Sequence, residues 1–365
     1  MSTRAARKVG SFPIVDQELP SSSAATSTVW FIRFAIAVHR DEVGQLAIYT
    51  YAASGLTRTV SNAIWHIECS VDYMPTSKNR NRLILVTGAT GHQGGAVLRH
   101  VVGRGFAVRA LTRDPDRLNA RVLGGHGAEV VKGDIEDQSS LTRALDGAYG
   151  VFSVQNPNEA GIEGEIRQGT NLADAARRTG ITHFVYSSVG SADQNTGIPH
   201  FDSKFRIEEH IRRTGLRFTI VRPVFFMENW LGMREAIANG RLELPLEPAT
   251  HLQMVAVNDI GGAVALAFEH PGKWQNRTFE LAGDELSMSE LAATFTRATG
   301  REVRYAQVPW DEFEGKAGKE MTLMWRWFQS SGYRVDIPVA RQEYPRLTTF
   351  TSWINSSWHT ETQTG

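Results

Sequence analysis

The pattern of apolar and polar positions changes near residue 80. Residues 1–80 show no sustained period of two or 3.6 residues, whereas short apolar runs and amphipathic stretches alternate from residue 83 onward. Such apolar runs are typical of strands that are buried on both faces of a parallel sheet. The predicted strands lie at residues 83–86, 107–112, 128–131, 150–154, 183–188 and 218–223. The predicted helices lie at residues 94–103, 141–145, 163–178 and 203–214.

The alternation predicts an α/β fold with a Rossmann-type, doubly wound parallel sheet, because each strand must be followed by a right-handed crossover. From about residue 229 the alternation breaks down, and short strands mix with helices and prolines. We therefore expect a Rossmann NAD(P)-binding domain at residues 81–228 and a smaller C-terminal α+β lobe at residues 229–365 that takes a substrate or partner. Residues 1–80 are expected to be an N-terminal extension, disordered or spurious, with Met74 as the natural start.

Composition narrows the possible functions. The 39 basic residues balance the 39 acidic ones, so the chain lacks the overall positive charge typical of proteins that bind nucleic acid directly. A single cysteine excludes a disulfide framework, the histidines lack the spacing of metal ligands, and no apolar stretch is long enough for a membrane span. We expect a cytoplasmic protein whose partner is a small-molecule substrate or a regulated protein. Its oligomeric state is left open.

A glycine-rich turn follows the first regular strand. Glycines at 88, 91 and 94 form a G-x-x-G-x-x-G pattern between that strand and a helix. The spacing allows a tight turn, close approach of the backbone to a pyrophosphate, and close packing of the helix, whose N-terminus attracts phosphate. The alternative is a purely structural glycine turn. The predicted phosphate-binding residues are Gly88, Ala89, Thr90, Gly91, His92, Gln93 and Gly94.

Residues at the ends of the next two strands are candidates for binding the adenosine part of a dinucleotide. NAD-specific folds carry an acidic residue near the end of the second strand, whereas this chain has Arg113 there, which could hold the 2′-phosphate of NADP(H) by charge-assisted hydrogen bonds. The alternative is a solvated arginine in a turn. Asp134 follows the third strand and could accept a hydrogen bond from the adenine amino group. It could equally be a helix N-cap, and the two roles can coexist.

These motifs resemble the NmrA-like family, which consists of atypical relatives of the short-chain dehydrogenases. The resemblance runs from residue 83 to about 353 and rests on residues 88–95, 111–113, 133–134, 168–169, 185–188, 200–204 and 228–229. It implies a Rossmann domain with NADP(H) lying across the strand ends. It also implies contacts on the nicotinamide side from Gln155, Asn156, Lys204, Phe226, Met227, Glu228 and Asn229.

Three residues are candidates for catalysis. Short-chain dehydrogenases use Tyr-x-x-x-Lys, and this chain has Lys204 at the lysine position but His200 at the tyrosine position. Their i, i+4 spacing places both on one helix face. Histidine titrates near neutrality and could act as a general acid, or it could only pack in a catalytically dead site. Ser188 could hydrogen-bond a substrate carbonyl, or could simply end a strand.

Two functions follow from these residues and the resemblance. One is an NADPH-dependent oxidoreductase that reduces a small carbonyl or quinone-type substrate, and the apolar run at residues 225–227 favours it. The other is a non-enzymatic NADP(H) redox sensor that regulates a protein partner, and the missing tyrosine favours that alternative. The family contains both classes, so the resemblance does not decide between them.

Overall fold

The computed structural model describes residues 34–40, 46–52 and 79–358. The chain divides into two compact units, residues 1–70 and 71–365. In the first unit, strands β1 (Phe34–Arg40) and β2 (Leu46–Ala52) pair antiparallel, a feature for which the sequence pattern made no prediction. The remainder of the predicted N-terminal extension up to residue 78, Met74 included, lies outside the described residues.

A seven-stranded sheet forms the centre of the second unit, and its strands run in the order β12-β8-β7-β6-β3-β4-β5. Every pair of neighbours is parallel, which confirms the predicted Rossmann-type sheet. Six of the strands appear where the apolar runs placed them. The bounds are β3 (Leu83–Val86), β4 (Ala107–Thr112), β5 (Ala128–Lys132), β6 (Ala148–Ser153), β7 (His183–Ser187), β8 (Phe218–Pro223) and β12 (Arg277–Leu281).

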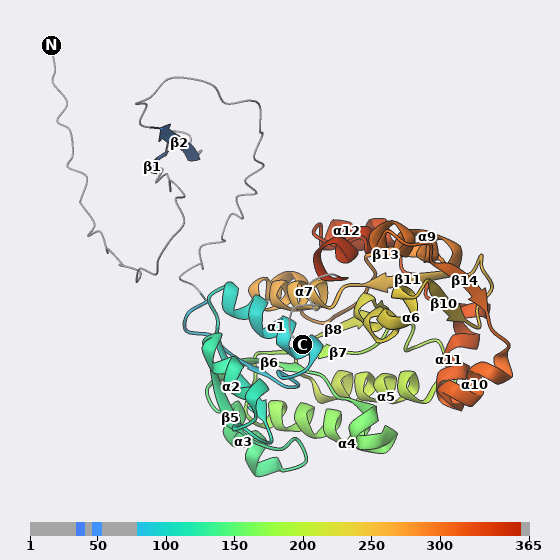
Figure 1. Cartoon of the computed structure of the whole chain (residues 1–365). Helices are drawn as coiled ribbons and strands as arrows, with labels where there is room; N and C mark the ends of the chain where they lie inside the picture. Colours follow the sequence, from blue (N-terminus) through green and yellow to red (C-terminus); the bar gives the residue numbers. More distant parts are fainter. Residues whose placement is uncertain (1–33, 41–45, 53–78, 359–365) are drawn as a thin grey trace, which may run out of the picture. The chain divides into compact units, whose positions relative to one another are not determined.

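Helices cover both faces of this sheet. Helices α1 (His92–Gly103) and α7 (Val257–Glu269) pack against each other on one face, and α4 (Pro157–Arg178) and α5 (Pro199–Thr214) pack together on the other (Figure 1). The remaining helices of these layers are α2 (Leu118–Gly125), which the pattern did not predict, and α3 (Gln138–Leu145). Among the described residues, no helix has both the length and the apolar character that a membrane span requires.

Burial explains why the strands read as uninterrupted apolar runs. On β3, Ile84 and Val86 belong to the core under α1 and α7, whereas Leu85 belongs to the core under α3, α4 and α5. All three side chains are fully buried. A strand that is covered on both faces has no solvent-facing positions, so the polar half of an alternating pattern is missing.

The smaller lobe contains the remaining elements. Its three-stranded sheet runs in the order β9 (Phe225–Phe226), β11 (His251–Val255) and β13 (Asp284–Ser287), with β11 in the centre. A separate parallel pair consists of β10 (Arg241–Leu244) and β14 (Arg304–Gln307). Its helices are η1 (Met227–Met233), α6 (Arg234–Ala238), α9 (Met288–Thr299), α10 (Trp310–Ala317), α11 (Lys319–Ser330), α12 (Ile337–Glu343), α13 (Phe350–Trp353) and η2 (Ile354–Trp358). The short helix α8 (Pro271–Trp274) instead contacts α7 and joins it to β12.

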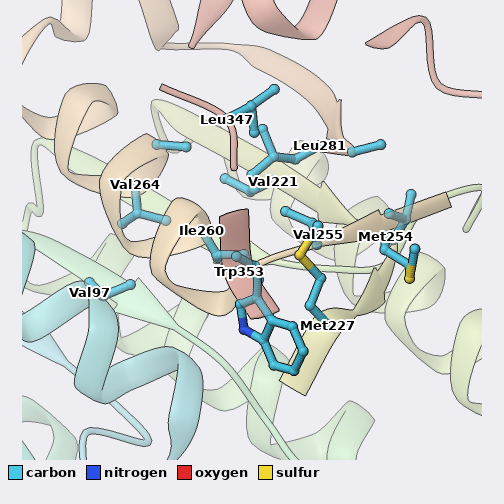
Figure 2. Packing of buried hydrophobic residues seen from close by; sticks show 14 of the residues in the cluster. Val97, Val221, Met227, Met254, Val255, Ile260, Val264, Leu281, Leu347 and Trp353 are labelled. Atoms are coloured by element: carbon cyan, nitrogen blue, oxygen red, sulfur yellow. The ribbon is translucent and has the colours of Figure 1, made fainter. Parts of the chain in front are cut away.

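The Rossmann layers and the C-terminal lobe are not separated by a single boundary at residue 229. Residues 257–281 contribute α7 and β12 to the Rossmann layers, although they follow the first elements of the lobe in sequence. Figure 2 shows Ile260 and Val264 of α7 in the same buried cluster as Val97 of α1. The chain therefore leaves the sheet after β8, forms part of the lobe, returns to the sheet, and leaves it again, which no local pattern reveals.

Candidate functional site

The strand order reverses at β3, which lies between β4 and β6 in the centre of the sheet. The loops that leave β3 and β6 therefore diverge to opposite faces and leave a crevice at the carboxyl edge, where open α/β sheets bind ligands. Thr87 ties the two strand ends together, because its hydroxyl donates to the Phe152 carbonyl (3.1 Å) and accepts from the Val154 amide (3.1 Å). These hydrogen bonds hold the ends of β3 and β6 together at the crevice.

The glycine-rich turn lines this crevice, directly after β3. Gly88 is exposed and has a φ of 60°, which favours a residue without a side chain. A Cβ on Gly94 would lie 2.2 Å from the Gly88 carbonyl oxygen, so only glycine lets α1 pack under the turn. Gly91 is the N-cap of α1 without a side-chain cap, and the first turn carries no acidic residue. These features suit a bound anion at the N-terminus of α1.

The residues of the turn that carry side chains differ in exposure. Thr90 and His92 are exposed and border an open cleft together with Glu228, whereas Ala89 is buried in the core. The Gln93 side chain reaches across the crevice, where its Oε1 accepts a hydrogen bond of 2.6 Å from the Ser187 hydroxyl at the end of β7. The predicted turn residues therefore lie together at the strand edge.

Arg113 and Asp134 follow β4 and β5 at the same edge. The Arg113 guanidinium is largely exposed and pairs with the Glu159 carboxylate (2.7 Å) in the first turn of α4. Asp134 accepts a hydrogen bond from the Glu136 amide, while Asp137 is the N-cap of α3 and accepts from Ser139. The helix-cap alternative for Asp134 was therefore wrong, because three further residues precede the helix. The contacts of Arg113 with the 2′-phosphate and of Asp134 with the adenine amino group stay predictions.

Gln155 and Asn156 leave β6 on the other side of the crevice. Gln155 is buried, its Nε2 donates to the Ser153 hydroxyl (3.0 Å), and its Oε1 has no hydrogen-bond partner among the described residues. The Asn156 side chain is the N-cap of α4 and accepts from the Asn158 amide (3.1 Å). Gly161 breaks α4 with a φ of 70°, so the first turn of this helix is separate from its long body.

The end of β7 carries further buried polar atoms. The hydroxyls of Tyr186 and Ser188 have no partner within the described part of the chain. Burial raises the pKa of the Tyr186 hydroxyl well above its usual value, and the nearby carboxylates of Glu165 and Glu208 add to the effect. Buried polar groups are normally hydrogen-bonded, so these hydroxyls are free to pair with a ligand or with an ordered water.

Lys204 lies on α5 next to these strand ends and is held by a buried carboxylate. Its Nζ is 2.6 Å from Oε1 of Glu165, whose side chain is fully buried on α4, and the Ser203 hydroxyl hydrogen-bonds the same carboxylate. Glu165 is not among the residues predicted from the sequence. It lies four residues before Gly169 and seven before Leu172, both buried, so its place on the inward stripe of α4 was a signal that could have revealed it.

His200 precedes Lys204 by one turn of α5, and its Nδ1 lies 2.8 Å from Oε1 of Glu320 on α11. The imidazole is 23% exposed and the carboxylate 48% exposed. Glu320 was also missed, because it is separated from His200 by 120 positions and lies in a different lobe. The structure therefore joins the histidine at the tyrosine position to a carboxylate.

The four residues from Phe226 to Asn229 occupy different surroundings. Phe226 is partly exposed and Asn229 is exposed, whereas Met227 is fully buried in the same hydrophobic cluster as Trp353 (Figure 2). The Glu228 carboxylate accepts from the Val257 amide (3.0 Å) and the Trp353 indole (3.1 Å), and burial raises its pKa. The Met227 side chain has no exposed surface in this structure. Its contact with the cofactor stays a prediction.

A parallel sheet of this order, with a glycine turn at its switch point and orphaned polar atoms around it, defines a dinucleotide-binding protein of the Rossmann type. The model of the NmrA-like family matches residues 80–354, which is most of the chain. The chain belongs to the NmrA-like family, as its motifs indicated.

Similar proteins include enzymes and a regulator. The NmrA-like family domain-containing oxidoreductase FrzB of Cladobotryum sp is 30% identical over 290 residues, which are 70% of this chain and 86% of the relative. An NADPH-dependent quinone oxidoreductase from Escherichia coli, solved with NADPH, is 23% identical with a TM-score of 0.65 and covers 74% of this chain and 98% of its own. The negative transcriptional regulator NmrA, solved with NADP, is also 23% identical with a TM-score of 0.65 and covers 76% and 96%.

Proposed function

We propose that the crevice binds NADP(H). The observation that carries the proposal is the combination of an uncapped helix N-terminus behind an exposed glycine turn with buried, unpartnered atoms of Gln155 and Ser188 at the other end. The turn offers backbone N–H groups to the pyrophosphate, and Arg113 offers a guanidinium to the 2′-phosphate. Gln155 and Ser188 supply the hydrogen bonds that a nicotinamide or a substrate carbonyl can complete.

We further propose that the protein is an NADPH-dependent oxidoreductase that reduces a small carbonyl or quinone-type substrate. A bound NADPH supplies a hydride, so the protein must orient the acceptor and provide a proton. Lys204 holds the ribose of the cofactor, the Ser188 hydroxyl hydrogen-bonds the substrate oxygen, and the partly exposed Phe226 offers an apolar surface for the substrate ring. The oxidoreductase relative and the quinone oxidoreductase of similar fold support this proposal.

Titration of the full-length protein with NADPH, NADP and NAD tests the cofactor proposal. We expect Arg113→Ala to weaken NADPH binding about tenfold, since a charge-assisted contact of an exposed guanidinium contributes about 1.5 kcal/mol, and to leave NADH affinity unchanged. Arg117→Ala is the matched control, because Arg117 is also a largely exposed arginine, at 80% against 70% for Arg113, and pairs with Asp114 in the same loop. Equal losses in both variants, or equal affinity for NADH and NADPH in the parent, contradict the role of Arg113.

A second candidate function is a non-enzymatic NADP(H) sensor that regulates a protein partner. Two observations favour it: a histidine stands at the tyrosine position, and Lys204 is occupied by the Glu165 carboxylate. The NADP-bound transcriptional regulator has a similar fold. NADPH oxidation followed at about 340 nm, a property of the nicotinamide ring, separates the two functions. Stoichiometric NADPH binding without turnover of any quinone or aldehyde selects the sensor.

A further inference from the structure

The pairing of His200 with Glu320 crosses from the Rossmann layers to the lobe. His200 lies in the first turn of α5, on the helix face that also carries Lys204 four residues later. The imidazole is oriented by the edge-on contact with Phe201 at a centroid distance of 5.0 Å and by the Glu320 carboxylate. Two separate contacts therefore define the plane of the ring.

Aromatic packing between α5 and α11 sets the position of Glu320 relative to His200. Glu320 lies in the first turn of α11, and Trp327 of the same helix meets the Phe201 ring edge-on at 5.5 Å. Tyr333, which follows α11, stacks on Phe201 with an interplanar angle of 15°. Phe201 is buried, so α11 is anchored to α5 beside His200.

The geometry has a chemical consequence for the imidazole. When Nδ1 carries hydrogen, it donates to the Glu320 carboxylate at 2.8 Å, and this bond selects one tautomer of the neutral ring. Nε2 is then the atom that exchanges a proton, and none of the residues in the described part of the chain hydrogen-bonds it.

We propose that Glu320 is a positioning residue that holds His200 as the proton donor of the reductase. The inference rests on the proposed oxidoreductase function. In the reduction of a carbonyl, the hydride forms the new C–H bond, the C=O π electrons move to oxygen, and that oxygen takes the proton of His200 Nε2. The neutral imidazole is reprotonated by water, to which its partly exposed side chain has access. One hydride and one proton thus convert the carbonyl to an alcohol.

Glu320→Gln tests the proposal, with Glu312→Gln as the matched control. Glu312 lies on the neighbouring helix α10, is 49% exposed against 48% for Glu320, and also forms one ion pair, with Lys316. General acid catalysis contributes about 100-fold or more, so we expect Glu320→Gln to lower kcat about tenfold by disordering the donor. KM and the NADPH dissociation constant stay within about twofold, Glu320→Asp restores part of kcat, and the control behaves like the parent.

A coupling test and a spectroscopic test complete the experiment. If Glu320 acts through His200, Glu320→Gln has no further effect on kcat in a His200→Ala background. Nitrogen-15 NMR of the cofactor-free protein should show a hydrogen-bonded Nδ1 proton that disappears in Glu320→Gln and His200→Ala but persists in Glu312→Gln. Absence of that signal from the parent, equal kcat in the Glu320 and Glu312 variants, or additive losses overturn the inference.

Failure of the proposed function gives a different result. A parent protein that binds NADPH and reduces no acceptor of the panel overturns the oxidoreductase function, and the role of Glu320 falls with it even where the Nδ1 signal is present. A parent protein with turnover that Glu320→Gln leaves intact overturns the inference alone.

Discussion

The two ends of the crevice are built in different ways. The end that we propose for the phosphates, called the phosphate end below, consists of backbone from one short segment, the turn at residues 87–94, in which Thr90 and His92 are exposed. The end that we propose for the nicotinamide, called the nicotinamide end below, consists of side chains that follow β6 and β7 or lie on α4, α5 and α11. They include a fully buried carboxylate and hydroxyls without a partner in the described part of the chain. A backbone site needs a local spacing of glycines, whereas a side-chain site needs a folded protein to assemble it.

Substitutions at the two ends of the crevice should therefore act in different ways. At the phosphate end, steric fit of the backbone matters more than any charge. At the nicotinamide end, buried polar groups balance one another, so removal of one group changes the stability of the free protein as well as its chemistry. Three substitutions test whether the two ends differ in this way.

The largest effect is expected from Gly94→Ala. The new Cβ would lie 2.2 Å from the Gly88 carbonyl oxygen and 2.8 Å from the Ala89 nitrogen, both of which are backbone atoms that cannot rotate away. We expect loss of measurable NADPH binding and a fall of roughly 3 kcal/mol or more in the free energy of unfolding. Chemical denaturation and NADPH titration measure both quantities.

Gly103→Ala controls for the presence of a methyl group on α1. No atom lies within 4 Å of a Cβ at Gly103, so the free energy of unfolding and NADPH affinity should match those of the parent. A Gly94→Ala variant that binds NADPH normally would contradict the close packing of α1 under the turn.

The next effect concerns the pair of Lys204 and Glu165. Lys204→Met leaves the fully buried Glu165 carboxylate without its cation, and breaking a buried pair in this way lowers the free energy of unfolding by about 3 kcal/mol. The double variant Lys204→Met with Glu165→Gln should recover most of that loss, because no uncompensated charge remains. Chemical denaturation of the single and double variants measures the coupling, and additive losses would contradict it.

The smallest effect has the opposite sign. Ser188→Ala removes a buried hydroxyl that lacks a partner in the free protein, so we expect the free energy of unfolding to rise by about 1 kcal/mol. Turnover should fall, because the substrate oxygen loses a donor. Ser187→Ala is the matched control, since its hydroxyl bonds to Gln93 and its removal should lower stability by about 1 kcal/mol. Equal stability changes in the two variants would show that the Ser188 hydroxyl is satisfied.

The sequence predicted the sheet well because its strands are buried on both faces. The apolar runs at residues 107–112 and 218–223 coincide with β4 and β8. Helix α2 escaped prediction because it is amphipathic only weakly, with Leu118 and Val122 exposed. The place of β12 beside β8 was not predicted, since the chain between the two strands enters the lobe before it returns to the sheet.

The glycine spacing was sufficient to predict the turn, the helix that follows it and the proposed phosphate end of the crevice, because those features depend on the backbone of consecutive residues. The tertiary structure alone decided that Glu165 meets Lys204, that Glu320 meets His200, and that the Ser188 hydroxyl is left without a partner. Each of these depends on which helix faces cover the sheet, and therefore on distances across the core that sequence separation does not encode.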